Sequence, residues 1–148
     1  MTRTYASSAG GGGGGVSDHG ALTGLSDDDH TQYTLLSKSF FIGDPTATED
    51  LSLFFTDEAI TITKMVAVLT GSATPSVTWT VRHDADRSAA GTEVVTSGTT
   101  TTSITTGSVV TSFNDATVDA DDFIWLETTA QSGTVTSLMV TIFYTRLP

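Results

Sequence analysis

Hydrophobic and polar residues alternate over most of the chain from residue 39 to the C-terminus. Val77, Trp79 and Val81 alternate with polar residues, and a longer alternation runs from Leu138 to Tyr144. A period of two residues is typical of a β-strand with one buried face. No window of useful length repeats its apolar residues at the helical period. The pattern therefore predicts a domain built from β-strands.

The apolar runs that predict strands are short, and turn-forming residues such as Gly71-Ser72 and residues 131–133 separate them. The runs lie at residues 40–42, 51–55, 60–69, 77–81, 94–95, 109–113, 123–126 and 138–144. Short strands at a spacing of about 8–12 residues are typical of a β-sandwich or barrel. We therefore predict that residues 39–148 form an all-β fold, an antiparallel β-sandwich with jelly-roll character.

Two of these runs are apolar on both faces. In the last one, Met139 and Phe143 lie on the opposite side from the row that begins at Leu138, and residues 123–126 are apolar without interruption. A strand that is apolar on both faces is typical of a position inside a sheet, with both faces covered. We expect the last strand to be central and the run 123–126 to be buried on both sides.

The first 38 residues have a different character. Residues 10–15 are six consecutive glycines, a composition that gives a flexible linker when it stands alone in water. Residues 16–38 contain many turn formers and few apolar side chains, so they cannot form a core by themselves. We expect residues 1–38 to form an extended arm that packs against copies of itself or against a partner.

The composition supports an all-β domain and excludes several classes of function. Threonine, which suits a pleated and half-buried surface, makes up about a fifth of the residues. The run Thr99 to Thr102 predicts an exposed edge strand or a loop. The formal charge of −11 argues against binding to nucleic acid and to an anionic membrane surface.

The absence of cysteine and of long apolar segments excludes further kinds of site and structure. The chain has no cysteine, so disulfides, zinc-thiolate sites and thiol catalysis are excluded. No stretch reaches the roughly 18 apolar residues of a membrane span. The N-terminus lacks the apolar region of a signal peptide, so we expect synthesis in a cytosol without export by the usual secretory route.

The segment 18–33, which reads DHGALTGLSDDDHTQY, carries the most specific pattern in the chain. It is similar to a motif, H-G-x-L-x-G-L-x-D-D-D-H-x-Q-Y, of fibre and appendage proteins of tailed bacteriophages. In those proteins the motif joins an N-terminal virion-binding piece to a C-terminal domain. The matching residues are His19, Gly20, Leu22, Gly24, Leu25, Asp27, Asp28, Asp29, His30, Gln32 and Tyr33. The match covers about a tenth of the chain.

The resemblance implies a structural protein of the virion that works as a homotrimer. Residues 1–38 would then be the attachment and trimerisation arm, with Arg3, Tyr5 and Val16 on the particle. The chain lacks the shaft repeats of long fibres, which favours a capsid decoration or head fibre on the outer surface of the particle. Its partner would be the major capsid protein or another virion protein. The alternative is a short tail-fibre or receptor-binding component that takes part in host adsorption.

The motif also contains metal-ligating residue types. His19, His30 and Asp27 to Asp29 could bind an ion where three copies converge on a threefold axis. The competing interpretation is a turn in which the aspartates cap backbone donors and the histidines bond across chains. We favour the turn and expect no metal or cofactor. A glycosidase carboxylate pair needs a cleft on a rigid scaffold, which nothing in this segment predicts.

A second polar cluster follows the strand around residue 79. His83, Asp84, Asp86, Arg87 and Ser88 invite a hydrolase triad or a calcium site. The nucleophile elbow G-x-S-x-G and the calcium-loop pattern are both absent. His83 is in phase with the buried row of the preceding strand. We therefore predict a charged surface turn, with His83 as the last residue of a core-facing row, and a protein that is not an enzyme.

Aromatic residues decide whether a sugar-binding face is available. Trp79 and Trp125 lie within apolar strands, where core packing is the default expectation. The tyrosines are Tyr5, Tyr33 and Tyr144. A host-surface glycan stays open as a partner, without a motif to support it.

Overall fold

The computed structural model describes residues 35–147, and these residues form an all-β fold without helices. Every strand pair is antiparallel. The strands are β1 (Leu35–Gly43), β2 (Asp50–Thr56), β3 (Ile60–Asp84), β4 (Thr92–Glu93), β5 (Thr99–Thr101), β6 (Ser108–Val110), β7 (Thr117–Val118) and β8 (Asp122–Arg146). The predicted β-rich domain is confirmed. Strand β1 begins at Leu35, four residues before the expected domain boundary at residue 39.

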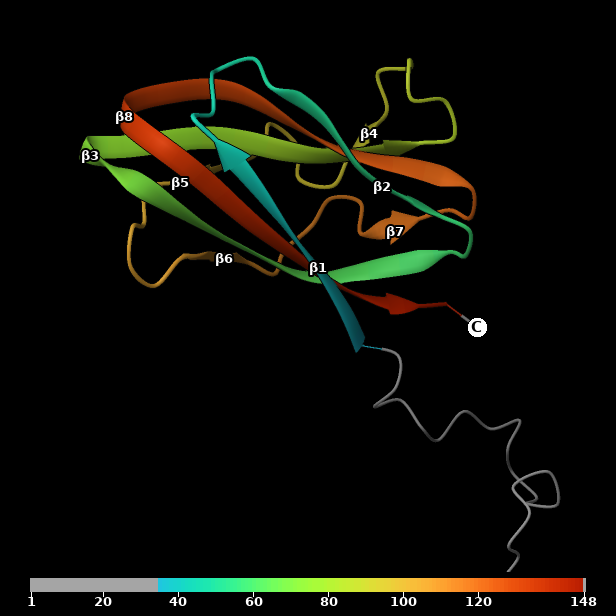
Figure 1. Cartoon of the computed structure of the whole chain (residues 1–148). Helices are drawn as coiled ribbons and strands as arrows, with labels where there is room; N and C mark the ends of the chain where they lie inside the picture. Colours follow the sequence, from blue (N-terminus) through green and yellow to red (C-terminus); the bar gives the residue numbers. More distant parts are fainter. Residues whose placement is uncertain (1–34, 148) are drawn as a thin grey trace, which may run out of the picture. The chain divides into compact units, whose positions relative to one another are not determined.

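Strands β3 and β8 form a long two-stranded ribbon that determines the architecture. Each has 25 residues, and they pair from Ile60 with Arg146 at one end to Asp84 with Phe123 at the other. Both strands bend back at the same end of the molecule (Figure 1). The prediction that residues 71–72 and 131–133 form turns between separate strands is therefore wrong. They are irregularities within two continuous strands, where the register shifts between Ser72 and Ser76.

Left-handed backbone at the bend explains which residues occur there. Ala73 and Thr74 have φ values of 57° and 56°, and Gly133 on the facing strand has a φ of 70°. A Cβ atom added at Gly133 would lie 2.6 Å from the backbone oxygens of both Ala73 and Thr74. Only glycine fits this close approach of two backbones. The bend therefore depends on a glycine on the β8 side of the ribbon.

The bent ribbon produces two layers that face each other. The first layer contains the first half of β3 and the second half of β8, flanked by β1 on one side and by β6 and β7 on the other. The second layer contains the remaining halves, flanked by β2 on one side and by β4 and β5 on the other. Two such sheets in antiparallel order make a double-sheet jelly roll, as the sequence predicts. Strand β8 lies inside both layers, so its central position is also confirmed.

The core lies between the layers and is closely packed. Cross-strand pairs Leu69–Leu138, Ala67–Val140 and Met65–Ile142 contribute fully buried side chains from the first layer. Trp79 fills the centre from the second layer, and its indole N–H donates to Thr101 Oγ1 over 2.9 Å. Each large side chain buried in this way contributes roughly 1.5–3 kcal/mol. The satisfied indole N–H removes the penalty of burying a polar group.

Aromatic stacking closes one edge of the sandwich. The ring of Phe54 lies 5.9 Å from the ring of Phe40 and 5.9 Å from that of Tyr144. Lys38 Nζ lies 4.0 Å from the centre of the Phe54 ring. Since β1 and β2 belong to different layers, this stack joins the layers where no hydrogen bonds can. Aromatic pairs of this kind add about 0.5–1.5 kcal/mol each beyond their buried area.

Candidate functional site

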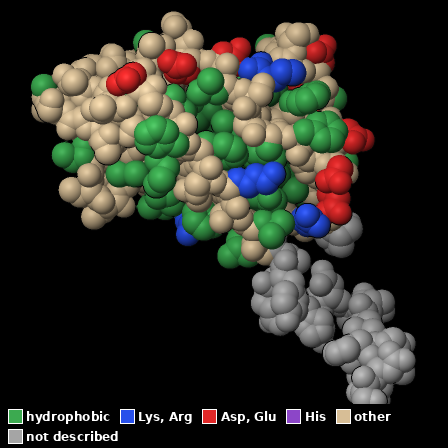
Figure 2. Space-filling view, in the orientation of Figure 1, with side chains coloured by type: hydrophobic (Ala, Val, Ile, Leu, Met, Phe, Trp, Pro, Cys, Tyr) green, Lys and Arg blue, Asp and Glu red, His purple; other side chains and the backbone are tan. Residues whose placement is uncertain are grey.

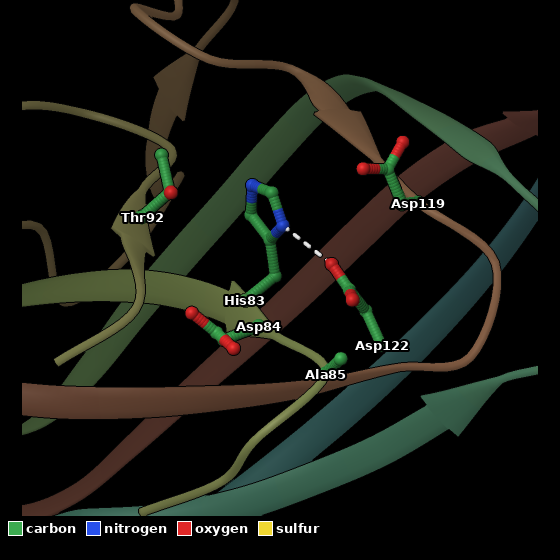
Figure 3. A pocket seen from close by; sticks show the side chains of 6 residues that line it. All are labelled: His83, Asp84, Ala85, Thr92, Asp119 and Asp122. Carbon is green, nitrogen blue, oxygen red and sulfur yellow. Dashed lines mark hydrogen bonds and ion pairs between the residues drawn. The ribbon is translucent and has the colours of Figure 1, made fainter. Parts of the chain in front are cut away.

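A small open pocket lies at the end of the sandwich where β3 finishes and β8 begins (Figure 3). Its volume is about 270 Å³. The residues around it are His83, Asp84, Ala85, Thr92, Asp119 and Asp122. They come from the end of β3, from β4 and from the segment that leads into β8. Carboxylates therefore surround one histidine at the mouth of the core.

His83 is tied to Asp122 across the ribbon. The imidazole Nδ1 lies 2.9 Å from Asp122 Oδ2, and each side chain is only 8% exposed. The other ring nitrogen, Nε2, is buried and has no hydrogen-bond partner among the described residues. It lies 3.8 Å from Asp115 Oδ2, which is too far for a hydrogen bond. The histidine therefore ends the core-facing row of β3, as its phase in the sequence predicts.

This arrangement is suited to holding the ribbon end rather than to catalysis. A general base must reach the proton that it removes, but Nε2 is enclosed by protein atoms. Among the residues that the structure describes, no three histidine and carboxylate side chains lie close enough together to hold a metal ion. The His83–Asp122 pair instead links the last core-facing residue of β3 to the first residue of β8.

The loop after β3 is the surface turn that the sequence predicts. Asp84 Oδ1 accepts the backbone N–H of Asp86, and Asp86 Oδ1 accepts both the N–H and the hydroxyl of Ser88. The hydroxyl bond, followed by the N–H bond, lowers the pKa of Asp86 below its ordinary value. Because Ser88 is engaged by Asp86, it is not directed at His83. The prediction of a structural turn is confirmed, and the imagined triad does not assemble.

Arg87 from the same loop covers Trp125, on the outer side of the second layer. The guanidinium lies 4.6 Å from the centre of the indole ring and also pairs with Asp50. A Cβ atom at Gly91, whose φ is 63°, would overlap the ring of Trp125. Trp125 is consequently fully buried although it points away from the core between the layers.

An ion-pair network completes this cover. Arg82 lies between Glu93 and Glu127, at 2.7 Å and 2.8 Å, with all three side chains less than a third exposed. Glu127 also accepts the indole N–H of Trp125 over 2.9 Å. We call this outer side of the second layer, formed by Arg82, Glu93, Trp125 and Glu127, the covered face. The chain itself covers Trp125 on this face, whereas the neighbouring Phe55 and Phe123 are 47% and 38% exposed.

The outer side of the first layer has no such cover among the described residues. Phe41 is 74% exposed, Val109 60% and Met139 40%. Cross-strand partners share a face, so the register places Phe41, Met139 and Val68 in one row. The neighbouring rows are Ser39, Thr141, Val66 and Val109, then Ser37, Phe143 and Lys64, and then Leu35, Thr145 and Thr61. We call these four rows the open face.

Figure 2 shows hydrophobic side chains gathered in the central and lower parts of the view, where Figure 1 draws β1, β8 and the first half of β3. Most Asp and Glu side chains in the same view lie along its upper and right-hand margins. No residue of the four rows carries a carboxylate. Apolar surface of this kind, surrounded by polar residues, marks an interaction site more often than it marks free surface.

Several residues that the sequence singles out do not form a site among the described residues. The motif residues between His19 and Tyr33, as well as Arg3, Tyr5 and Val16, lie outside the described residues. Tyr144 faces the interior, and Trp79 and Trp125 are fully buried, so none of the three offers a ring to a sugar. The expected burial of 123–126 on both sides is wrong at Phe123, which is 38% exposed and contacts Phe55 instead.

The sequence alone did not indicate the partner of His83 or the open face. Asp122 is part of a run that reads as a turn, and only the pairing of β3 with β8 brings it to the histidine. The open face had a signal in Phe41, Met139 and Val109, which are apolar residues on the polar phase of their strands. That signal is interpretable only when the strand order is known.

Comparisons with known proteins add little to this geometry. No family model and no curated protein matches the chain. A solved structure described as "Cyanophage Pam1 capsid asymmetric unit" aligns over 78% of this chain and 83% of that chain, with 14% sequence identity and a TM-score of 0.39. A similarity at this level carries no argument, so the fold assignment rests on the strand pairing above. No helix of the described residues is long and apolar enough to span a membrane.

Proposed function

We propose that the chain is a structural protein of a tailed-bacteriophage particle, a homotrimeric capsid decoration or head-fibre protein anchored by residues 1–38. The observation that carries this proposal is the segment His19 to Tyr33, which matches the appendage motif at every specified position. The segment directly precedes a compact β-domain, which is the order of parts that the resemblance implies.

Two surface features of the described domain support a role in assembly. Its one candidate site encloses the histidine nitrogen that a reaction would need, whereas the open face presents apolar side chains to a partner. Double-sheet jelly rolls occur in viral capsid domains, but also in lectins and cupins, so the fold alone does not decide the function.

The proposed mechanism is mechanical. Three chains pool the small apolar surface of residues 16–34, and threefold symmetry closes the assembly. Three arms then bind the major capsid protein or another virion protein together, so weak single contacts give a high overall affinity. The jelly rolls lie on the outer surface of the particle.

Electron cryo-microscopy of intact particles tests this role through the position and copy number of the chain. We expect trimers across the icosahedral shell, with residues 1–38 against capsid protein. A few copies confined to the tail would support the alternative, a short tail-fibre or receptor-binding component. In that case the free protein should also block adsorption of the phage to its host.

A further inference from the structure

The open face presents apolar side chains that no other described residue covers. The face combines three exposed apolar residues, Phe41, Val109 and Met139, with partly exposed Val66 and Val68 on strand β3. These residues lie on β1, β3, β6 and β8, so they are held by a rigid sheet rather than by a loop. A rigid apolar surface loses little conformational entropy when a partner covers it.

We propose that the open face binds other copies of this chain around a threefold axis, with one part of each face against a different part of its neighbour's face, so that three jelly rolls meet through their first layers. The inference rests on the proposed homotrimer and states which surface its β-domains share. Two observations identify a second copy as the occupant.

The first observation is charge. The chain carries a formal charge of −11, so two copies that approach through most of their surface repel each other. The open face is an exception, because its rows contain no carboxylate and its one charged residue is Lys64. Lys64 Nζ lies 4.0 Å from the centre of the Phe143 ring, so the cation rests on the sheet itself. Open faces that meet around a threefold axis bring together the part of each copy with the least like charge.

The second observation is where the chain enters the domain. Leu35 is the first described residue, belongs to the open face and is 58% exposed. The 34 residues before it contain the segment that the proposed function assigns to trimerisation. If that segment joins three copies, each copy is tethered at the edge of its own open face. The tether raises the effective concentration of one open face around another.

Sedimentation velocity of the full-length chain tests the proposal across a range of concentrations. We compare the wild type with Phe41→Ser and Met139→Thr, which replace open-face residues. Phe55→Ser is the matched control, because Phe55 is 47% exposed on β2 in the other layer. We expect at least a tenfold weaker association for each open-face variant and no change for the control. Far-ultraviolet circular dichroism checks that each variant is folded.

Proximity is tested by cross-linking, which the absence of natural cysteines makes simple. Ser39→Cys places a thiol on the edge strand β1 of the open face, beside Thr141, and Ser52→Cys places one on β2 next to Arg87. Both serines are exposed, and each makes one side-chain hydrogen bond. With a short bismaleimide, we expect covalent oligomers from Ser39→Cys and monomers from Ser52→Cys.

The outcomes separate this inference from the proposed function. A trimer that neither open-face variant weakens, and that Ser39→Cys does not cross-link, keeps the homotrimer and overturns the open-face contact. A dimer that both variants dissociate keeps the contact and overturns the homotrimer. A wild type that stays monomeric at all concentrations overturns both, and leaves the face to residues 1–34 of the same chain or to capsid protein.

Discussion

The two outer faces of this jelly roll are built on the same ribbon but treat their apolar side chains differently. On the covered face, Trp125 lies beneath Arg87 and its indole N–H is bonded to Glu127. On the open face, Phe41 and Met139 project from β1 and β8 without a cover among the described residues. An apolar side chain on an outer face therefore indicates a binding surface only where no other part of the chain covers it.

Connections between strands explain the difference. The loop that follows β3 folds back over the second layer and delivers Arg87 and Gly91 to Trp125. The loop that crosses from β5 to β6 instead runs beside β3, where the Ser103 carbonyl accepts the N–H of Leu69. No described loop reaches across the open face. The chain thus covers Trp125 on the covered face, whereas no described residue covers Phe41 and Met139 on the open face.

Among the variants that test this comparison, the removal of the Trp125 side chain should cause the largest loss of unfolding free energy. Trp125→Ala leaves a void under the loop, and losses for such changes are about 3–5 kcal/mol of unfolding free energy. Trp125→Phe keeps most of the packing and loses the bond to Glu127, so it should cost clearly less. Urea denaturation measures both variants. A loss below about 1 kcal/mol for Trp125→Ala would show that the cover contributes no packing.

Arg82→Met should have the next largest effect, because it leaves Glu93 and Glu127 close together without their shared cation. We expect a loss of about 1–3 kcal/mol in unfolding free energy, the range for a partly buried charge without its partner. The triple variant Arg82→Met, Glu93→Gln, Glu127→Gln removes the stranded charges as well. It should recover most of the loss. Failure to recover would mean that the arginine acts through packing of its stem rather than through charge.

Arg87→Ala opens the cover without removing the indole. The expected loss is about 0.5–1 kcal/mol, since the cation–π contact is near the surface and the pair with Asp50 is largely exposed. Tryptophan emission gives a more sensitive readout, because exposure of Trp125 shifts its emission to longer wavelength while Trp79 stays in the core. Arg87→Lys keeps a cation over the ring and should show a smaller shift. Unchanged emission in Arg87→Ala would contradict the assigned cover.

Phe41→Ser should have the smallest effect on the folding of a single chain. Its ring is 74% exposed, and exposed substitutions of this kind usually fall within about 0.5 kcal/mol of zero. Denaturation at high dilution measures this value, and the same experiment at high concentration should show a loss of the extra stability that association gives the wild type. A large loss at high dilution would place Phe41 among the residues that hold the monomer together.

Much of the fold follows from the sequence, because the period-two pattern is local. The strands around Val77 to Val81 and Leu138 to Tyr144, the central place of the last strand and the phase of His83 were all predictable from it. The bend was not, because Gly71-Ser72 and residues 131–133 are ordinary turn signals. Only their close approach across the ribbon shows that both strands continue through them.

The site was less predictable than the fold for the same reason. Bonds between His83 and Asp122 and between Glu127 and Arg82 join residues about 40 positions apart, and no local pattern encodes them. The motif between His19 and Tyr33 is the reverse case. It is strongly patterned and local, it lies outside the described residues, and its role as a trimerisation segment stays a prediction.

The long ribbon also has a consequence for how the protein is made. Among the described strands, β1 bonds only to β8, and Leu35 pairs with Thr145 near the end of β8. On a ribosome, the first strand must therefore wait for the last strand to be synthesised. Pairing between such distant segments is slow to form and leaves edges exposed meanwhile. We therefore expect the jelly roll to complete its folding only after β8 has left the ribosome, with the backbone of β1 unpaired until then.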